Sequence, residues 1–132
     1  MVNKMQTARG VALSTLGEIF QDGAFSNIAL KKSLGKATLS DVDKSLVTEI
    51  VYGTVSRKLT LEWYLSHFVA DRDQVDPWIY HLLLMSLYQF VYLEKIPLHA
   101  VVHEAVELAK QRKKGSEKYV NALLRKMLRE EL

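Results

Sequence analysis

Hydrophobic residues recur at three- and four-residue spacing along almost the whole chain, and short polar segments separate the runs. This spacing places apolar side chains on one face of an α-helix, because a helix has about 3.6 residues per turn. No segment alternates convincingly between apolar and polar residues, as a half-buried strand would. The pattern therefore predicts an all-α protein, a bundle of six or seven helices joined by short loops.

Three helices are expected in the first half of the chain. The first is marked by apolar residues from Ala8 to Phe20 and is expected to stop at Gly23, and a shorter one over about 25–34 ends before Gly35. Ser40, with Asp43 three residues later, resembles a capping box and predicts the start of a third helix. A continuation begins near Thr60, and the pattern leaves open whether it is a separate helix or a bend.

The second half contains the clearest start signal, in which Asp76 can cap a helix and Pro77 suits its first position. The helix that follows, to about Leu93, is the most apolar of the chain, so we expect it at the centre of the core. Its aromatic residues are interpreted as core rather than as a base-stacking surface; they are Trp78, Tyr80, Tyr88, Phe90 and Tyr92.

Two histidines four residues apart, His99 and His103, raise the question of a metal site on the next helix, which begins after Pro97. They share a polar face with Glu107, where no apolar surroundings would form a dry pocket. The zinc-protease motif also fails, because Glu107 stands where a second histidine is required. We therefore expect no metal here. The core face of this helix should consist of Leu98, Val101, Val102, Ala105, Leu108 and Ala109.

Composition places the chain among ordinary soluble domains. Its 132 residues, 48% of them hydrophobic, suffice for a single domain with its own core. Cysteine is absent, which excludes disulfides and a cysteine nucleophile and favours a reducing, cytoplasmic setting. No apolar run reaches the roughly 20 residues that span a bilayer, and no secretory signal begins the chain. We therefore expect no association with a membrane.

Positive charge is concentrated near the end of the chain. The net charge is only +3, yet residues 110–129 contain eight Lys or Arg and one acid, Glu117, which gives 8 − 1 = +7. Within this segment, Ser116 is expected to cap a last helix over 117–129. One side of that helix is apolar, with Tyr119, Val120, Leu123, Leu124 and Met127, and the other carries Lys118, Arg125 and Arg129. Such a row can follow a phosphate backbone, although a merely solvated face is an equally open interpretation.

The segment "IPLHAVVHEAVELAKQRKKGSEKYVNALLRKML" resembles the C-terminal signature of the NusB fold. Upstream, "ARGVALSTLGEIFQDGAFSNIAL" and "LSDVDKSLVTEIVYGTVSRKLTLEWYL" are similar to the N-terminal region of the Sun/Fmu (RsmB) ribosomal RNA cytosine-5 methyltransferases. The resemblance covers nearly the whole chain. "EIVYGTVSR" leading into "TLEWYL" favours this methyltransferase-linked version over a free-standing antitermination factor.

The resemblance implies that residues 1–132 form one NusB-like, RNA-binding domain without catalytic activity. It would help a C-terminal catalytic domain of the same protein to engage small-subunit ribosomal RNA, and that domain would use S-adenosylmethionine. Family enzymes need two cysteines for this chemistry, so a chain without cysteine is not an enzyme by itself. It also has no glycine-rich turn for the cofactor, and its final "RKMLREEL" is interpreted as a domain boundary.

Candidate RNA contacts follow partly from the resemblance and partly from charge. Arg9, Arg57, Arg125 and Lys126 match basic positions of the family pattern. Those added on charge are Lys58, Lys113, Lys114, Lys118 and Arg129. Glu104 and Asn121 match recurring polar positions, but they lie near helix seams and are interpreted as hydrogen-bond partners between helices rather than RNA contacts. His103 stands where the family pattern has asparagine, so this chain departs from the family at that polar position.

The sequence is also consistent with two alternative functions. One is a free-standing antitermination factor that pairs with a ribosomal protein and binds a leader RNA. The other is a module that only docks a catalytic domain, for which an exposed apolar patch is expected.

Overall fold

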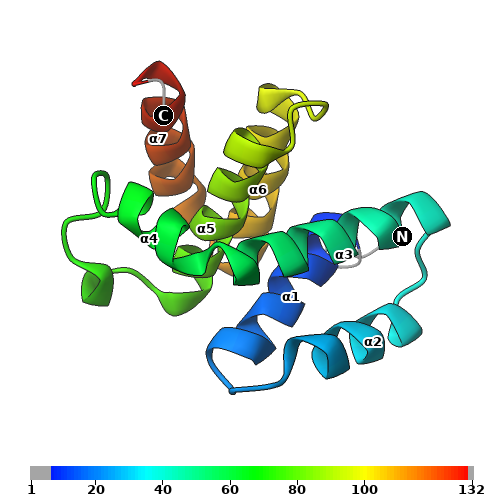
Figure 1. Cartoon of the computed structure of the whole chain (residues 1–132). Coiled ribbons are helices and arrows are strands. Elements are labelled where there is room, and N and C mark those ends of the chain that lie inside the picture. Colours follow the sequence, from blue (N-terminus) through cyan, green and yellow to red (C-terminus); the bar gives the residue numbers. More distant parts are fainter. Residues whose placement is uncertain (1–6, 131–132) are drawn as a thin grey trace. The chain divides into compact units, whose positions relative to one another are not determined.

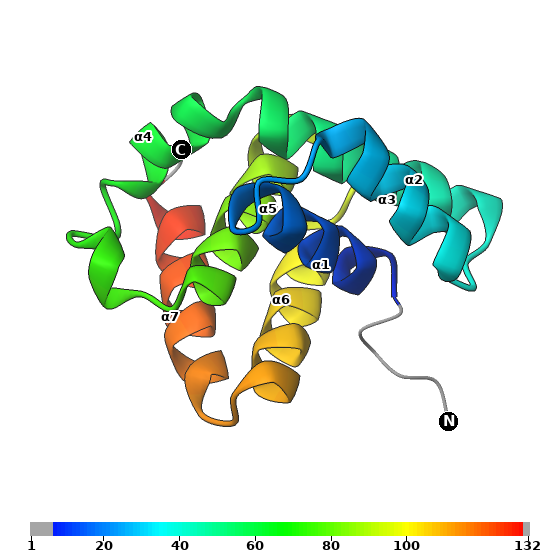
Figure 2. The same ribbon diagram turned by 90° about the horizontal axis from the view of Figure 1, so that it is seen from below.

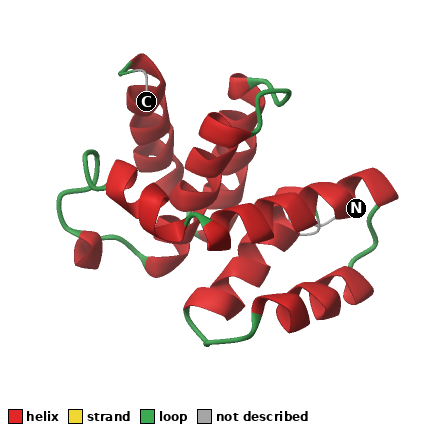
Figure 3. Ribbon diagram, in the orientation of Figure 1, coloured by secondary structure: helices red, strands yellow, loops and turns green. Residues whose placement is uncertain are grey.

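A computed structural model describes residues 7–130 of the chain, and within this range every regular element is helical (Figures 1 and 3). The expected all-α fold is therefore confirmed, with seven α-helices and a short 3₁₀ helix, η2, in the described part. The elements are α1 (Ala8–Phe20), α2 (Ser26–Lys36), α3 (Asp41–Ser56), α4 (Lys58–Leu65), η2 (Arg72–Gln74), α5 (Pro77–Tyr92), α6 (Leu98–Arg112) and α7 (Ser116–Arg129). None of the helices in this range is long and apolar enough to cross a membrane.

The helices fall into two compact units, which we call the three-helix unit (Met1–Arg57) and the four-helix unit (Lys58–Leu132). In the three-helix unit, α1 packs against both α2 and α3. The Thr15 hydroxyl of α1 lies 2.8 Å from that of Ser33 in α2, and Lys32 Nζ lies 3.4 Å from Glu18 Oε1. A polar seam thus supplements the apolar packing between α1 and α2.

The boundaries in the three-helix unit agree closely with the periodic pattern. The range of α1 is as predicted, and Gly23 beyond it has a positive φ of 73°, which suits glycine. Ser40 caps α3 as expected, since its Oγ accepts a hydrogen bond of 3.1 Å from the Asp43 N–H. The predicted end of α2 before Gly35 is wrong. The helix runs through this glycine to Lys36, because Gly35 has no positive φ and a helical glycine costs only about 1 kcal/mol relative to alanine.

At Arg57 the backbone leaves helical values, with φ −109° and ψ 18°. The structure thereby decides the alternative that the pattern left open, because α4 is a separate helix rather than the bent end of α3. It also begins at Lys58, two residues before the expected start at Thr60.

In the four-helix unit, α5 packs against α4, α6 and α7, and α6 packs against α7 (Figure 2). All residues from Ile79 to Gln89 are buried, which confirms the expected central position of α5. Asp76 caps it, since Oδ1 accepts a 2.8 Å hydrogen bond from the Trp78 N–H. Of its aromatic residues, Tyr80 and Tyr88 are buried as expected, while the other three, Trp78, Phe90 and Tyr92, are only half-buried.

The turn from α6 into α7 differs from the prediction. The residue at the cap is Gly115, whose φ of 105° permits a sharp reversal, and Ser116 is already the first residue of α7. The Ser116 hydroxyl lies 2.9 Å from the Ala109 carbonyl and 2.7 Å from that of Lys113. This serine therefore ties α7 to the end of α6 instead of capping its own helix.

Two residues predicted as core are exposed. Leu98 is 47% exposed, because it opens α6 beyond the packed part of the helix, whereas the other five residues of the expected core face are buried. Tyr119 is 44% exposed although Val120, Leu123, Leu124 and Met127 are buried. Tyr119 lies at the edge of the apolar side of α7, where an ideal helical wheel does not separate a buried from an exposed position.

Candidate nucleic-acid interface

A row of basic side chains follows the outer face of α7. Lys118, Arg125 and Arg129 are all exposed, at spacings of seven and four residues. With a rise of about 1.5 Å per residue, they span roughly 16 Å along the helix axis. Lys126 is exposed beside this row, while the opposite face, including Leu124, is buried. We call the exposed residues Lys118, Arg125, Lys126 and Arg129 the basic row.

The charges of the basic row are not neutralised within residues 7–130. None of its four members forms a salt bridge with another residue of this range. Arg125 Nε donates a 3.0 Å hydrogen bond to Asn121 Oδ1 on the same helix, and this bond uses neither of the two terminal guanidinium nitrogens. The row can therefore offer cationic donors to an external polyanion.

Contrary to the expectation, the hydrogen bond that Asn121 forms within residues 7–130 stays inside α7 and does not join two helices. Glu104, the other residue expected at a seam, is half-buried on α6. Both His99 and His103 are exposed. No group of three metal-ligating side chains occurs within the described range.

The loop between α6 and α7 extends the positive charge. Lys113 and Lys114 are both exposed there, next to the first turn of α7. Glu117, the single acid of the segment, uses Oε1 to accept a 2.5 Å hydrogen bond from the Gly115 N–H. This carboxylate therefore stabilises the turn between α6 and α7.

The remaining predicted contacts differ in setting. Lys58 Nζ lies 3.5 Å from Glu62 Oε1, so part of its charge is compensated within α4. Arg57 is exposed and Arg9 is half-buried, and both belong to the three-helix unit. The structure thus gathers six of the nine candidates on α7 and the loop before it, namely Lys113, Lys114, Lys118, Arg125, Lys126 and Arg129.

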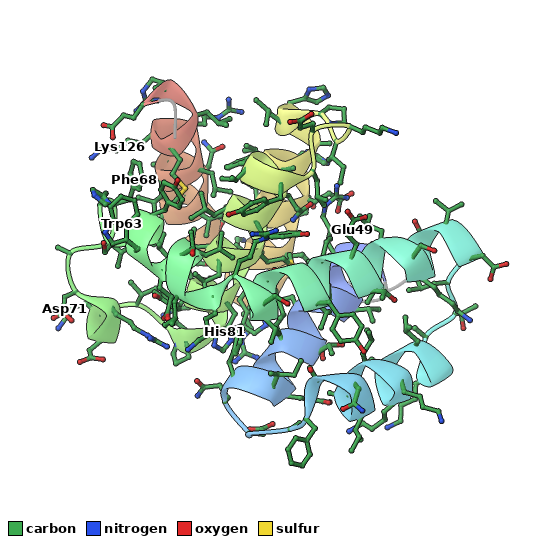
Figure 4. The ribbon with its side chains drawn as sticks, viewed as in Figure 1. Glu49, Trp63, Phe68, Asp71, His81 and Lys126 are labelled. Atoms are coloured by element: carbon green, nitrogen blue, oxygen red, sulfur yellow. The ribbon has the colours of Figure 1, made fainter. Side chains whose placement is uncertain are left out.

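A groove of 630 Å³ lies beside the first turn of α7. Residues 68–79, from the connection between α4 and α5 and from the first turn of α5, form one wall, and residues 113–119 form the other. Asp71 of this connection is labelled in Figure 4. Tyr119 stands on the second wall, and partial burial raises the pKa of its phenol. Sequence reasoning did not find this groove, because its walls are far apart in the chain.

A hydrogen-bonded cluster centred on Glu62 holds the connection before α5. Glu62 Oε2 accepts hydrogen bonds from Arg72 Nη1 at 2.6 Å and from the Tyr80 hydroxyl at 3.0 Å. The Arg72 guanidinium also lies 4.4 Å from the centre of the Tyr80 ring. Burial and the hydrogen bond to Glu62 raise the pKa of Tyr80 to about 12, so the phenol stays protonated and keeps donating. Residues of α4, η2 and α5 are thereby joined.

His81 follows on α5 and is buried. Burial lowers the pKa of His81, and the positive charges of Arg72 and Lys58 lower it further, against a smaller opposing effect of Asp76. This imidazole is therefore neutral at physiological pH.

Comparison with known proteins agrees with the resemblance found in the sequence. The sequence profile of the NusB family matches residues 6–129 and so spans both units. The chain is 44% identical over 128 residues to "Probable ribosomal RNA small subunit methyltransferase B" of Bacillus subtilis (strain 168). It is 35% identical over 130 residues to the protein of the same name from Synechocystis sp. (strain ATCC 27184 / PCC 6803 / Kazusa). Each match covers 96% of this chain but only 29% of the relative.

A solved structure has the same fold. A chain in "Crystal Structure of a Plectonemic RNA Supercoil" superposes with a TM-score of 0.86 over 98% of this chain and 96% of that chain. The two sequences are only 14% identical, so this likeness concerns the fold alone. Because the family profile covers nearly all of its residues, the chain belongs to the NusB family.

Proposed function

We propose that this chain is the RNA-binding, non-catalytic N-terminal domain of an S-adenosylmethionine-dependent small-subunit ribosomal RNA (cytosine-5) methyltransferase of the cytoplasm. It would hold ribosomal RNA in place for a catalytic domain that follows in the same protein. The basic row is the observation that carries this proposal, because four exposed cations without salt bridges inside residues 7–130 face outward from one helix.

The comparisons support the methyltransferase part of the proposal. The two relatives described above are both named as ribosomal RNA methyltransferases, and this chain corresponds to less than a third of their length. The remaining length leaves room for the catalytic domain. This chain has no cysteine, so the covalent step of the family would depend on that domain, as would binding of S-adenosylmethionine. These relatives favour the proposal over a free-standing antitermination factor.

The RNA surface is expected to centre on the basic row and the adjoining loop, with Lys58 and the two arginines of the three-helix unit as further contacts. Each phosphate contact releases bound counterions, so the affinity should fall steeply as salt rises. The complete set of proposed contacts is Arg9, Arg57, Lys58, Lys113, Lys114, Lys118, Arg125, Lys126 and Arg129.

Binding of a small-subunit ribosomal RNA fragment across a salt series tests the proposal. The double variant Arg125→Glu/Arg129→Glu should bind at least about tenfold more weakly and show a shallower salt dependence. Lys31→Glu/Lys36→Glu is a matched control, because it reverses two exposed charges on α2 outside the proposed surface. Equal loss in both variants would mean that only net charge matters. Retained binding in the first variant would contradict the proposed surface.

A second candidate function, docking of a catalytic domain, is favoured by an exposed apolar pair on α4. Leu59 is 81% exposed and Trp63, one helical turn further, is 60% exposed. Exposed apolar side chains on adjacent turns are typical of protein contacts. Leu59→Ser/Trp63→Ser should weaken association with a separately produced catalytic domain while leaving RNA affinity unchanged. The Arg125→Glu/Arg129→Glu variant should weaken RNA binding and leave association with the catalytic domain unchanged.

A further inference from the structure

The groove beside α7 combines an apolar interior with an exposed aromatic ring. Val69 and Ile79 are buried in its first wall, at 8% and 5% exposure, and Tyr119 stands on the second wall at 44% exposure. Its volume of 630 Å³ lies within the range of about 300–1,000 Å³ that is usual for small-ligand sites. A flat, partly apolar group is therefore the kind of ligand that this groove can accommodate.

The two walls of the groove carry opposite charges. Lys113 and Lys114 lie on the wall that leads into α7, and Asp71 and Asp76 lie on the opposite wall. Oδ1 of Asp71 accepts a 3.0 Å hydrogen bond from the Asp73 N–H, and Oδ1 of Asp76 accepts one from its own helix start. The second oxygen of each carboxylate has no hydrogen-bond partner within residues 7–130, so both can accept from a ligand.

The wall that carries the carboxylates is held in place without a ligand. Arg72 follows Asp71 in the chain, and the Arg72 side chain is held by the Glu62 carboxylate and by the ring of Tyr80. Tyr80 in turn donates a hydrogen bond to Glu62. On the other wall, the Ser116 hydroxyl ties the first turn of α7 to α6. A groove whose walls are held in this way binds its ligand with a smaller loss of conformational entropy.

We propose that this groove binds one unpaired RNA nucleotide whose base carries an exocyclic amino group, as cytosine, adenine and guanine do and uracil does not. The base stacks on Tyr119, the amino group donates to the carboxylates, and the phosphates meet Lys113 and Lys114. Single-stranded RNA is recognised by this combination of aromatic stacking and backbone cations. The inference rests on the proposed RNA-binding function and specifies a site within it.

The proximity of the basic row favours a nucleotide over an apolar peptide. Lys118 precedes Tyr119 in the chain, so a strand whose base enters the groove can continue along the cations of α7. An apolar peptide would fill the groove but would leave these cations without a partner. Charge complementarity therefore selects a polyanion with flat bases.

Binding of fluorescently labelled oligocytidylate and oligouridylate to the full chain tests this inference. The wild-type protein should bind oligocytidylate more tightly. Tyr119→Ala should lower that affinity about tenfold, whereas Tyr119→Phe, which keeps the stacking ring, should stay close to wild type. Tyr52→Ala is the matched control, because Tyr52 is a tyrosine of α3 with a similar exposure of 40% and lies outside the groove. It should bind like wild type.

A substitution at Asp76 tests the proposed preference for bases that carry an exocyclic amino group. Asp76→Ser removes a carboxylate while serine preserves the helix cap, so α5 should keep its start. This variant should bind the two oligonucleotides with more nearly equal affinity. An unchanged preference for oligocytidylate would overturn the role of the carboxylate.

The outcomes separate this inference from the proposed function. If Tyr119→Ala binds like wild type while Arg125→Glu/Arg129→Glu loses binding, the groove is not a base site, although the basic row still binds RNA. If duplex RNA binds as well as the single strands and competes with them, the inference is also overturned. If neither oligonucleotide nor the ribosomal RNA fragment binds at low salt, both proposals fail.

Discussion

The helices α5 and α7 pack against each other in the four-helix unit, yet they differ in how much of their surface is buried. In α5 every residue from Ile79 to Gln89 is buried, so no face is left for solvent. In α7 four apolar residues are buried and the opposite face carries the basic row. A helix that is apolar all round belongs to a core, whereas an amphipathic helix can combine packing with binding. Substitutions in α5 should therefore affect folding, and those on the outer face of α7 should affect binding.

The largest expected effect is a loss of stability from truncation in α5. Leu83 is fully buried, and Leu83→Ala should lower the free energy of unfolding by about 2–5 kcal/mol, because the lost contacts leave a cavity. Urea denaturation followed by circular dichroism measures this. Leu124→Ala on the buried face of α7 should behave similarly, while Arg129→Ala should stay within about 0.5 kcal/mol of wild type. If Leu124→Ala and Arg129→Ala lowered the free energy of unfolding by the same amount, α7 would not be divided into a packing face and a binding face.

The next effect concerns RNA affinity without a change in stability. Arg129→Ala should reduce the slope of log K against log salt concentration by about 0.7 if it removes one phosphate contact on a single strand. Filter binding at several salt concentrations checks this. An Arg129→Ala protein with an unchanged slope would indicate that this position contacts solvent rather than phosphate.

A smaller effect is expected at the cluster around Glu62. Tyr80→Phe removes the hydroxyl that donates to Glu62 Oε2, but Arg72 still pairs with the carboxylate. The free energy of unfolding should fall by about 1 kcal/mol, the usual contribution of one hydrogen bond. Thermal unfolding compared with wild type measures it. A loss as large as that of Leu83→Ala would show that the cluster is more important to the core than its partial exposure suggests.

The smallest effect is a pH dependence that arises from His81 in α5. Because the pKa of His81 is lowered in the folded state, the unfolded chain binds its proton more readily. The stability from neutral His81 is thus present above its unfolded pKa of about 6.5 and declines as pH falls below that value. Urea midpoints between about pH 7.5 and 5 should decrease, and less so in His81→Gln. The exposed His103→Gln is the matched control, and it should leave the decline unchanged.

Much of the local structure could be predicted from spacing and capping residues. Ser40 and Asp76 start their helices as expected, since a side chain that caps a helix acts on backbone within three residues of itself. The alignment of Lys118, Arg125 and Arg129 could also be predicted, because residues seven and four apart share one helical face. By contrast, the exposure of Tyr119 and the half-burial of Arg9 depend on which neighbours pack beside each helix.

By itself, the sequence determined the helical class, most helix boundaries, the buried course of α5 and the concentration of positive charge on α7. These properties depend on interactions within a few residues, which periodicity records directly. Only the tertiary structure decided that residues 68–79 meet residues 113–119 in a groove and that Arg72 reaches Glu62. It also decided that Ser116 bonds to the end of α6. Such contacts join segments that local spacing does not relate, and they form only when the helices pack.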